Sequence, residues 1–333
     1  MRRRDLLLVP LLAAWTRSVE AQVPAKIHSL ALLSPTRPLS HMTETGPSIY
    51  FRALFEELRR LGYVEGHNLI VRRYSAEGRA ENLAELAREV VRQQPDVIST
   101  NTGRVTQHLR AATTTIPIVT TTTDPISLGL AVSLSRPGGN VTGYSTEPSL
   151  DLYGKYLEIL REIRPKLGKI GFLAPKAMWD LPQAQSLEHA ADRMSVRILG
   201  PALESPFQES EYRRVLAAMA EEGVEALIVS DSPENILRRE LIIELTRMSR
   251  IPAIYPYVDD AAAGGLIAYT GSLKDMGRVC ADYIARILEG ASPADLPFQQ
   301  PTRMGLAINL KTARELGITI PESVLVRADE VIE

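Results

Sequence analysis

The chain has very little cysteine and no excess of charge of either sign. Cys280 is the only cysteine, so no intramolecular disulfide can form and no Cys/His set of the kind that holds structural zinc can be assembled. The 38 Lys and Arg side chains face 40 Asp and Glu, which gives a formal net charge of −2. Because a nearly neutral chain has no electrostatic footprint for a polyanion, we expect no nucleic-acid partner.

The sequence also lacks the short motifs that carry catalysis and cofactor binding. No GxGxxG follows the first predicted strand, and neither GxxxxGK nor HExxH occurs. The closest approach to a nucleophile elbow begins at Gly143 and reads GYSTE, with Glu147 where the second glycine would stand. We therefore expect no enzyme, no cofactor and no metal site.

The N-terminus has the pattern of a secretory signal. Three arginines at 2–4 precede an apolar stretch at 6–15, and Val19-Glu20-Ala21 places small residues where a signal peptidase reads them. Ten helical residues span about 15 Å, half the hydrocarbon thickness of a bilayer. We expect residues 1–21 to be a signal peptide and the protein to be periplasmic, with the Sec and twin-arginine routes both open. No cysteine follows the apolar stretch, so we expect no lipid anchor.

Short β-type runs alternate with amphipathic helices from residue 28 onward, which predicts an α/β fold with parallel sheets and crossover helices. Apolar side chains recur at helical spacing within 51–61, 83–91 and 276–287. The predicted strands are residues 29–34, 68–74, 96–100, 117–122, 169–174, 225–230 and 252–256.

The two halves of the chain repeat an ordered set of short matches. Ser34-Pro35, Asp96-Val97-Ile98 and Ile116-Pro117 correspond to Ala174-Pro175, Glu225-Ala226-Leu227 and Ile251-Pro252, at offsets of 140, 129 and 135 residues. This order predicts two copies of one α/β unit. The break between them is predicted at 135–140, where one proline and two glycines interrupt helix and strand; the segment reads equally as a hinge or as an ordinary turn.

Hydroxyl and acidic residues gather where the predicted strands end, the edge at which open α/β sheets bind ligands. Helix N-termini at such an edge favour a carboxylate and an aspartate there receives an ammonium, so the pattern suits a zwitterion. The alternative for each residue is helix capping, for which Ser, Thr and Asp are preferred. The candidates are Ser34, Thr36, Thr102, Gly103, Thr123 and Asp124 in the first half, and Ser230, Asp231, Tyr257 and Asp259 in the second.

Trp179 is a further candidate, because it is the only tryptophan left once the signal peptide is removed. It follows the strand at 169–174, and the duplicated arrangement matches its loop to residues 34–38, at the mouth of the predicted cleft. An indole there would stack on a ligand. The alternative is that Trp179 packs against the helix that begins near Leu181.

Three long segments resemble the ABC transporter substrate-binding proteins of the tryptophan-binding-like, type I periplasmic family. They are SLSRPGGNVTGYS, FEELRRLGYVEGHNL and the tail that begins GASPADLPFQQPTRMGLAINL. The resemblance implies two Rossmann-like lobes joined by a three-stranded hinge, one formed by 26–143 with 272–302 and the other by 144–271 with 303–333. It extends to Thr123-Asp124-Pro125 but departs from the family at 174–179, where an Asn-Pro followed by another Asn is usual.

The resemblance implies a monomeric solute-binding protein that captures a small organic ligand, an amino acid or related carboxylate, and delivers it to an ABC permease. The alternative is a ligand-sensing domain that serves a signalling or regulatory partner. No DNA-binding helix pair precedes residue 28, and an export signal does. The sequence does not name the ligand.

Overall fold

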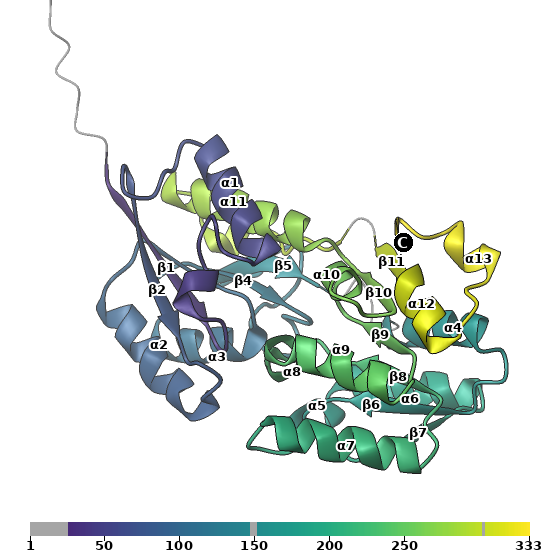
Figure 1. The fold of residues 1–333 in the computed structure, drawn as a ribbon. Coiled ribbons are helices and arrows are strands. Elements are labelled where there is room, and N and C mark those ends of the chain that lie inside the picture. Colours follow the sequence, from purple (N-terminus) through teal and green to yellow (C-terminus); the bar gives the residue numbers. More distant parts are fainter. Residues whose placement is uncertain (1–25, 147–151, 302–303) are drawn as a thin grey trace, which may run out of the picture.

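The structure, a computed structural model, describes residues 26–146, 152–301 and 304–333. These residues form two β-sheets, each with helices on both faces, and the two layered units lie next to each other (Figure 1). The signal peptide expected at 1–21 lies outside the described residues. A search of the described helices finds none with the length and apolar character needed to cross a membrane.

The first sheet has five parallel strands in the order β2-β1-β3-β4-β5. Alternate residues of β1 show how both of its faces are covered: Leu30 and Leu32 pack with α1 and α11, whereas Ala31 and Leu33 pack with α2 and α3. The strands are β1 (His28–Ser34), β2 (Leu69–Ser75), β3 (Val97–Thr100), β4 (Ile118–Thr122) and β5 (Val141–Ser145), and the helices are α1 (Ile49–Arg60), α2 (Leu83–Arg92), α3 (Gly103–Ala112) and α11 (Leu273–Leu288).

The helix α11 returns to the first sheet after the chain has built most of the second. It lies along α1 (Figure 1), and a Cβ at Gly277 would come within 2.4 Å of the backbone oxygen of Tyr50. A glycine therefore allows the two helices to approach closely. The single cysteine, Cys280, is buried in this contact.

The second sheet has seven strands in the order β12-β11-β10-β9-β8-β6-β7, all pairs parallel except β10 with β11. The strands are β6 (Lys169–Leu173), β7 (Arg197–Leu199), β8 (Ala226–Val229), β9 (Ala253–Tyr255), β10 (Ile267–Thr270), β11 (Gly305–Asn309) and β12 (Glu330–Ile332). The helices are α4 (Leu152–Ile163), α5 (Lys176–Trp179), α6 (Pro182–Arg193), α7 (Glu209–Glu221), α8 (Pro233–Leu237), α9 (Arg239–Met248), α10 (Val258–Ala262), α12 (Leu310–Leu316) and α13 (Glu322–Leu325). Its two faces carry separate apolar clusters, one with α4 and α6 and the other with α7 and α9.

The structure confirms the predicted fold class of two α/β lobes built on parallel sheets. The chain passes between the sheets three times, after β5, after β10 and before β11. Each of the seven predicted strands is present, with bounds that agree within one or two residues. The antiparallel pairing of β10 with β11 and the strands β5, β7, β10, β11 and β12 were not predicted.

The glycine-rich segment at 135–140 is the loop that leads into β5, so it does not separate the two sheets. Gly143 lies within β5, pairs with Thr120 of β4 and has a φ of 148°. A Cβ at this position would lie 1.8 Å from the Thr120 backbone oxygen, so only glycine fits. Because β5 continues to Ser145, the chain leaves the first sheet two residues beyond the lobe boundary placed after residue 143. The division into 26–143 with 272–302 and 144–271 with 303–333 stays a prediction.

Candidate functional site

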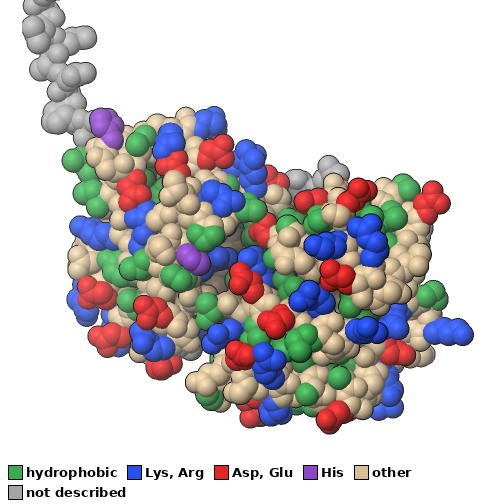
Figure 2. All heavy atoms as spheres, in the orientation of Figure 1, with side chains coloured by type: hydrophobic (Ala, Val, Ile, Leu, Met, Phe, Trp, Pro, Cys, Tyr) green, Lys and Arg blue, Asp and Glu red, His purple; other side chains and the backbone are tan. Residues whose placement is uncertain are grey.

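The carboxyl ends of strands from both sheets border one cavity. The cavity has a volume of about 310 Å³, and its wall combines residues after β3 and β4 of the first sheet with residues after β6, β8 and β9 of the second. Figure 2 shows the surface hollowed between the two units, with basic and acidic side chains on both sides. A cavity of this size between two lobes is typical of a small-molecule site.

The wall from the first sheet presents a helix N-terminus and hydroxyl groups. Thr102 is the N-cap of α3, where its hydroxyl accepts a hydrogen bond from the backbone N–H of Val105 at 3.3 Å. Thr122 lies beside Gly103 with only 4 % of its surface exposed, and neither its Oγ1 nor Oδ1 of Asn101 has a hydrogen-bond partner among the described residues. Buried polar groups in native proteins are normally paired, so a polar ligand fits this wall.

Arg37 supplies a cation to the same wall. It follows β1 by three residues, its backbone N–H donates to Oγ of Ser34 at 3.1 Å, and the residue lines the cavity. Burial lowers the pKa of its guanidinium, the charge of Arg239 acts in the same direction, and the negative charges of Asp259 and Asp260 oppose both. In the described ranges no acidic side chain forms an ion pair with Arg37. A partly buried guanidinium without an ion-pair partner favours a carboxylate ligand, which it can bind through two parallel hydrogen bonds.

The wall from the second sheet presents an acid and a phenol. Asp231 follows β8 and Tyr257 follows β9, and both line the cavity. Burial raises the pKa of the Asp231 carboxyl to about 6 and also raises that of Tyr257, on which the neighbouring charge of Asp231 acts in the same direction. Asp231 has no ion-pair partner within the described part of the chain. Burial makes this carboxyl costly to ionise in the ligand-free protein. An ammonium group that binds beside it offsets that cost, so the site favours such a group.

Much of the remaining wall of the cavity is apolar. This apolar wall includes Leu128, Leu273 and Met276 from the first unit, and Ala177, Met178, Leu181 and Ile236 from the second, while Arg104, Gln107 and Ser232 add polar groups beside it. A side chain without charge therefore fits between the two polar walls. The described ranges contain no cluster of three His, Cys, Asp or Glu side chains that could hold a metal ion.

A second cavity of about 620 Å³ adjoins the first and shares Arg37 and Tyr257 with it. Thr36 and Asp259 line this second cavity. Burial raises the pKa of Asp259, and the charge of Arg239 acts in the opposite direction. Burial also raises the pKa of Asp260 to about 7, and this carboxyl lies 3.8 Å from Arg239.

One ion pair joins the two units at the rim of the first cavity. Arg104, in α3, lies 3.5 Å from Glu234, in α8. The Glu234 side chain is only 11 % exposed, whereas that of Arg104 is 42 % exposed. The pair connects α3 of the first unit with α8 of the second.

The family described as ABC transporter substrate binding protein matches residues 46–332. The chain belongs to this family. A tyrosine-binding protein from Clostridioides difficile is 24% identical over 269 residues, which cover 80% of this chain and 76% of that protein.

Solved structures agree with the family of substrate-binding proteins. A conserved domain protein from Vibrio cholerae matches with a TM-score of 0.81 and 27% identity, over 92% of this chain and 100% of that one. An ABC domain from Streptococcus pneumoniae, solved in complex with L-Trp, matches with a TM-score of 0.80 and 24% identity, over the same shares. The fold is that of type I periplasmic binding proteins.

The substrate-binding protein brings together some of the residues predicted for its site and separates others. Thr102, Gly103, Thr123, Asp231 and Tyr257 line the first cavity, and Thr36 and Asp259 line the second. Three other predicted residues line neither of these two cavities, and each makes a local hydrogen bond. Ser34 accepts from the Arg37 N–H, and Ser230 accepts from Asn235 at 3.0 Å. Asp124 accepts from the N–H groups of Ile126 and Ser127. The residues after Asp124 form a turn and not a helix, so its carboxylate holds that turn and does not cap a helix.

Trp179 belongs to the packing of the second lobe in this substrate-binding protein. Its ring lies 5.2 Å from that of Phe172, and its Nε1 donates to the backbone oxygen of Ala174 at 3.3 Å. Neither large cavity is lined by Trp179, although the preceding Met178 lines the first. Both side chains pack against the apolar cluster of the second lobe, and only Met178 also lines the first cavity.

Replacing Trp179 with alanine is expected to lower the free energy of unfolding by about 1–2 kcal/mol and to leave ligand affinity unchanged. Met178→Ala is the matched control, since it removes a cavity contact one residue away. This control is expected to weaken binding by about threefold to tenfold. Chemical denaturation and calorimetry of both variants measure the two quantities. A loss of affinity in Trp179→Ala at unchanged stability would contradict this assignment.

The sequence did not single out Arg37, Thr122 or the apolar wall as site residues. The signal for Arg37 was its place, three residues beyond Ser34 at the carboxyl end of a strand. A loop arginine normally reads as a solvated surface residue, and only the three-dimensional arrangement puts this one opposite Asp231.

Proposed function

We propose that this substrate-binding protein captures a free amino acid between its lobes. The observation that carries the proposal is the pair of Arg37 and Asp231 on opposite walls of one cavity, each without an ion-pair partner in the described ranges. Arg37 binds the ligand carboxylate, assisted by the hydroxyl groups and helix N-terminus of the first-sheet wall. Asp231 receives the ammonium.

The apolar wall sets the class of side chain. Leu128, Met178 and Leu181 offer carbon and sulfur surface, which suits an aromatic or large aliphatic side chain. The relative named for tyrosine and the structure solved with L-Trp support an aromatic amino acid. Two charge-assisted contacts and burial of one ring are sufficient for a micromolar Kd, which corresponds to about −8 kcal/mol.

The same proposal covers the setting of the protein. An exported chain, with residues 1–21 removed as a signal peptide, acts as a monomer in the periplasm and delivers its ligand to an ABC permease. A ligand that contacts both lobes favours the closed arrangement, in which the cavity walls face each other. Membership of a substrate-binding family supports this setting over that of a sensing domain or an enzyme.

The experiment that tests the function is a thermal-shift screen of the mature protein against the common amino acids, with sugars and polyamines as the comparison set. Aromatic amino acids are expected to raise Tm most, because a ligand at 100 times its Kd adds about 2.7 kcal/mol of stability. A rise with sugars or polyamines and none with amino acids would overturn the proposal.

A further inference from the structure

The loop that carries Arg37 is long and contains little regular structure. It runs from the end of β1 at Ser34 to the start of α1 at Ile49, with a single 3-10 turn at Leu39–His41. Most of its cavity-facing residues lie before and within that turn, on the wall of the second cavity. A loop of this length needs anchors elsewhere if it is to hold a guanidinium in one place.

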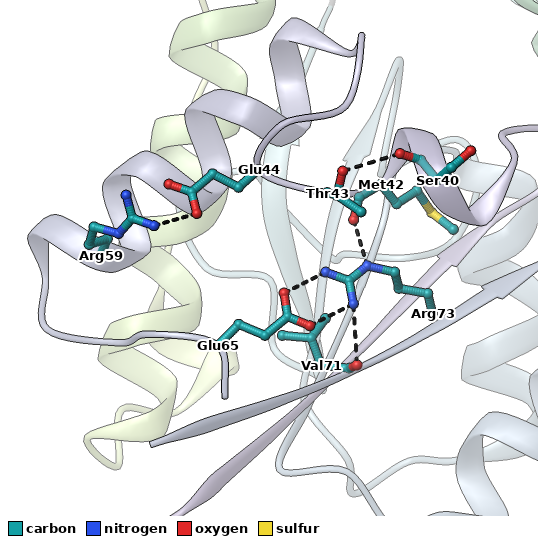
Figure 3. Close-up of polar contacts among 8 residues, drawn as sticks. All are labelled: Ser40, Met42, Thr43, Glu44, Arg59, Glu65, Val71 and Arg73. Atoms are coloured by element: carbon teal, nitrogen blue, oxygen red, sulfur yellow. Dashed lines mark hydrogen bonds and ion pairs between the residues drawn. The ribbon is translucent and has the colours of Figure 1, made fainter. Parts of the chain in front are cut away.

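Arg73, on the edge strand β2, provides such an anchor. Figure 3 shows its guanidinium between the loop and Glu65. Its Nε donates to the backbone oxygen of Met42 at 2.7 Å, and its two terminal nitrogens donate to the two carboxylate oxygens of Glu65 at 2.7 and 2.6 Å. The guanidinium also lies 5.3 Å from the centre of the Phe55 ring, and the side chain is only 16% exposed. A planar donor that is fixed on several sides makes a rigid support.

The anchored residue is close to Arg37 in the chain. Met42 ends the 3-10 turn, where its N–H donates to the backbone oxygen of Leu39 at 3.2 Å, and its side chain is fully buried in the core of the first lobe. On the other side, the Arg37 N–H is held by Ser34. Arg37 therefore lies on a short span that is fixed at Ser34 and at Met42, and Arg73 holds the second of these points.

We propose that Arg73, held by Glu65, is a positioning residue that orients Arg37 for the ligand carboxylate without touching the ligand. The inference rests on the proposed function, in which Arg37 binds that carboxylate. The same loop has a second ion pair, between Glu44 and Arg59 (Figure 3), but its side chains are 38% and 58% exposed and it follows Met42 in the chain. That pair is not expected to affect Arg37.

The test compares Arg73→Met with Glu44→Gln. Methionine keeps an apolar stem beside Phe55 and loses every donor to Met42 and Glu65. In the free protein, amide hydrogen exchange of Arg37 and of residues 39–42 is expected to rise in Arg73→Met and not in Glu44→Gln. Affinity for L-tyrosine is expected to fall by about 5- to 30-fold, whereas affinity for L-tyrosine amide, which lacks the carboxylate charge, changes little. Glu44→Gln is expected to bind both as the unaltered protein does.

The double variant of Arg73→Met with Arg37→Ala distinguishes a loss of positioning from a general loss of structure. The effect of Arg73→Met is expected to disappear in an Arg37→Ala background, because no guanidinium is left to orient. If Arg73→Met does not fold, Glu65→Gln replaces it, since it leaves the bond to Met42 in place and is expected to show the same pattern at about 2- to 5-fold.

Two results overturn the inference. One is an unchanged affinity for L-tyrosine in Arg73→Met while Arg37→Ala weakens binding. The other is an equal loss for L-tyrosine and its amide that persists in the Arg37→Ala background. If neither Arg37→Ala nor Arg73→Met weakens binding, the proposed function fails as well.

Discussion

Replacing Arg37 with alanine is expected to weaken the binding of a free amino acid by about 30- to 1000-fold, which corresponds to about 2–4 kcal/mol. The guanidinium is partly buried and has no acidic side chain paired with it in the described ranges, so a bound carboxylate would be its counter-ion. Without it, the ligand carboxylate is buried against hydroxyl groups and a helix N-terminus alone. The cost includes the desolvation of that unpaired charge, which is why the loss exceeds that of an ordinary hydrogen bond.

Arg37→Lys separates charge from geometry. Lysine keeps the positive charge but presents a point charge in place of a planar pair of donors, so it is expected to recover only part of the lost affinity. Calorimetry of the three proteins gives the comparison, and the unfolding free energy, which should change little because the loop is held at Ser34 and Met42, serves as the control. An Arg37→Ala protein that binds as tightly as the original would remove Arg37 from the site.

The second large effect is expected at Asp231. Its pKa of about 6 in the free protein means that the carboxyl is largely ionised at pH 7.5 and largely protonated at pH 5. An ammonium ligand binds the ionised form, so affinity is expected to be constant above pH 7 and to fall by up to about tenfold per pH unit below pH 6. Asp231→Asn is expected to weaken binding by about 10- to 150-fold at pH 7.5 and to flatten this pH dependence.

The same substitution is expected to stabilise the free protein. The pKa of this carboxyl is higher in the folded than in the unfolded state, so between about pH 4 and 6 the folded protein binds more protons than the unfolded chain. The stability of the fold therefore falls as the pH rises through this range, and above about pH 6 the ionised carboxylate destabilises the fold. Removing the charge is therefore expected to raise the unfolding free energy at pH 7.5 by about 1–2 kcal/mol, less than the full shift implies because the residue is partly exposed. A variant that is less stable and binds normally would mark Asp231 as structural.

Most of the fold could be predicted because its strands are buried on both faces. The predicted strands at 29–34 and 225–230 contain apolar runs of strand length, the strand at 117–122 is rich in β-branched residues, and the structure covers all three from both sides. Three of the five missed strands carry a weaker signal: β7 has three residues and no fully buried one, β12 is mostly exposed, and β5 contains Gly143. The other two, β10 and β11, are short and largely buried, and were missed all the same. The antiparallel pairing of β10 with β11 depends on a late return of the chain, which local sequence does not encode.

The candidate site likewise contains some residues that the sequence predicts and others that it does not. Residues at strand ends, such as Thr102, Asp231 and Tyr257, could be predicted because parallel sheets place those ends on one edge. Asp124 has the same sequence signature, but its carboxylate is taken up by two N–H groups of the following turn. For Arg37 and Met178 the direction of the side chain decides, and that direction depends on the conformation of the loop after β1 and on packing around α5. The spacing of residues holds no information on it.

The most direct test of the account is a calorimetric comparison of L-tyrosine with two analogues, tyramine, which lacks the carboxylate, and 3-(4-hydroxyphenyl)propionate, which lacks the ammonium. All three share the ring that the apolar wall would contact. We predict a micromolar Kd for L-tyrosine with one site per chain, and a Kd at least about 100-fold weaker for each analogue. Analogues that bind as tightly as L-tyrosine would contradict the assignment of Arg37 and Asp231 to the two charged ends of the ligand.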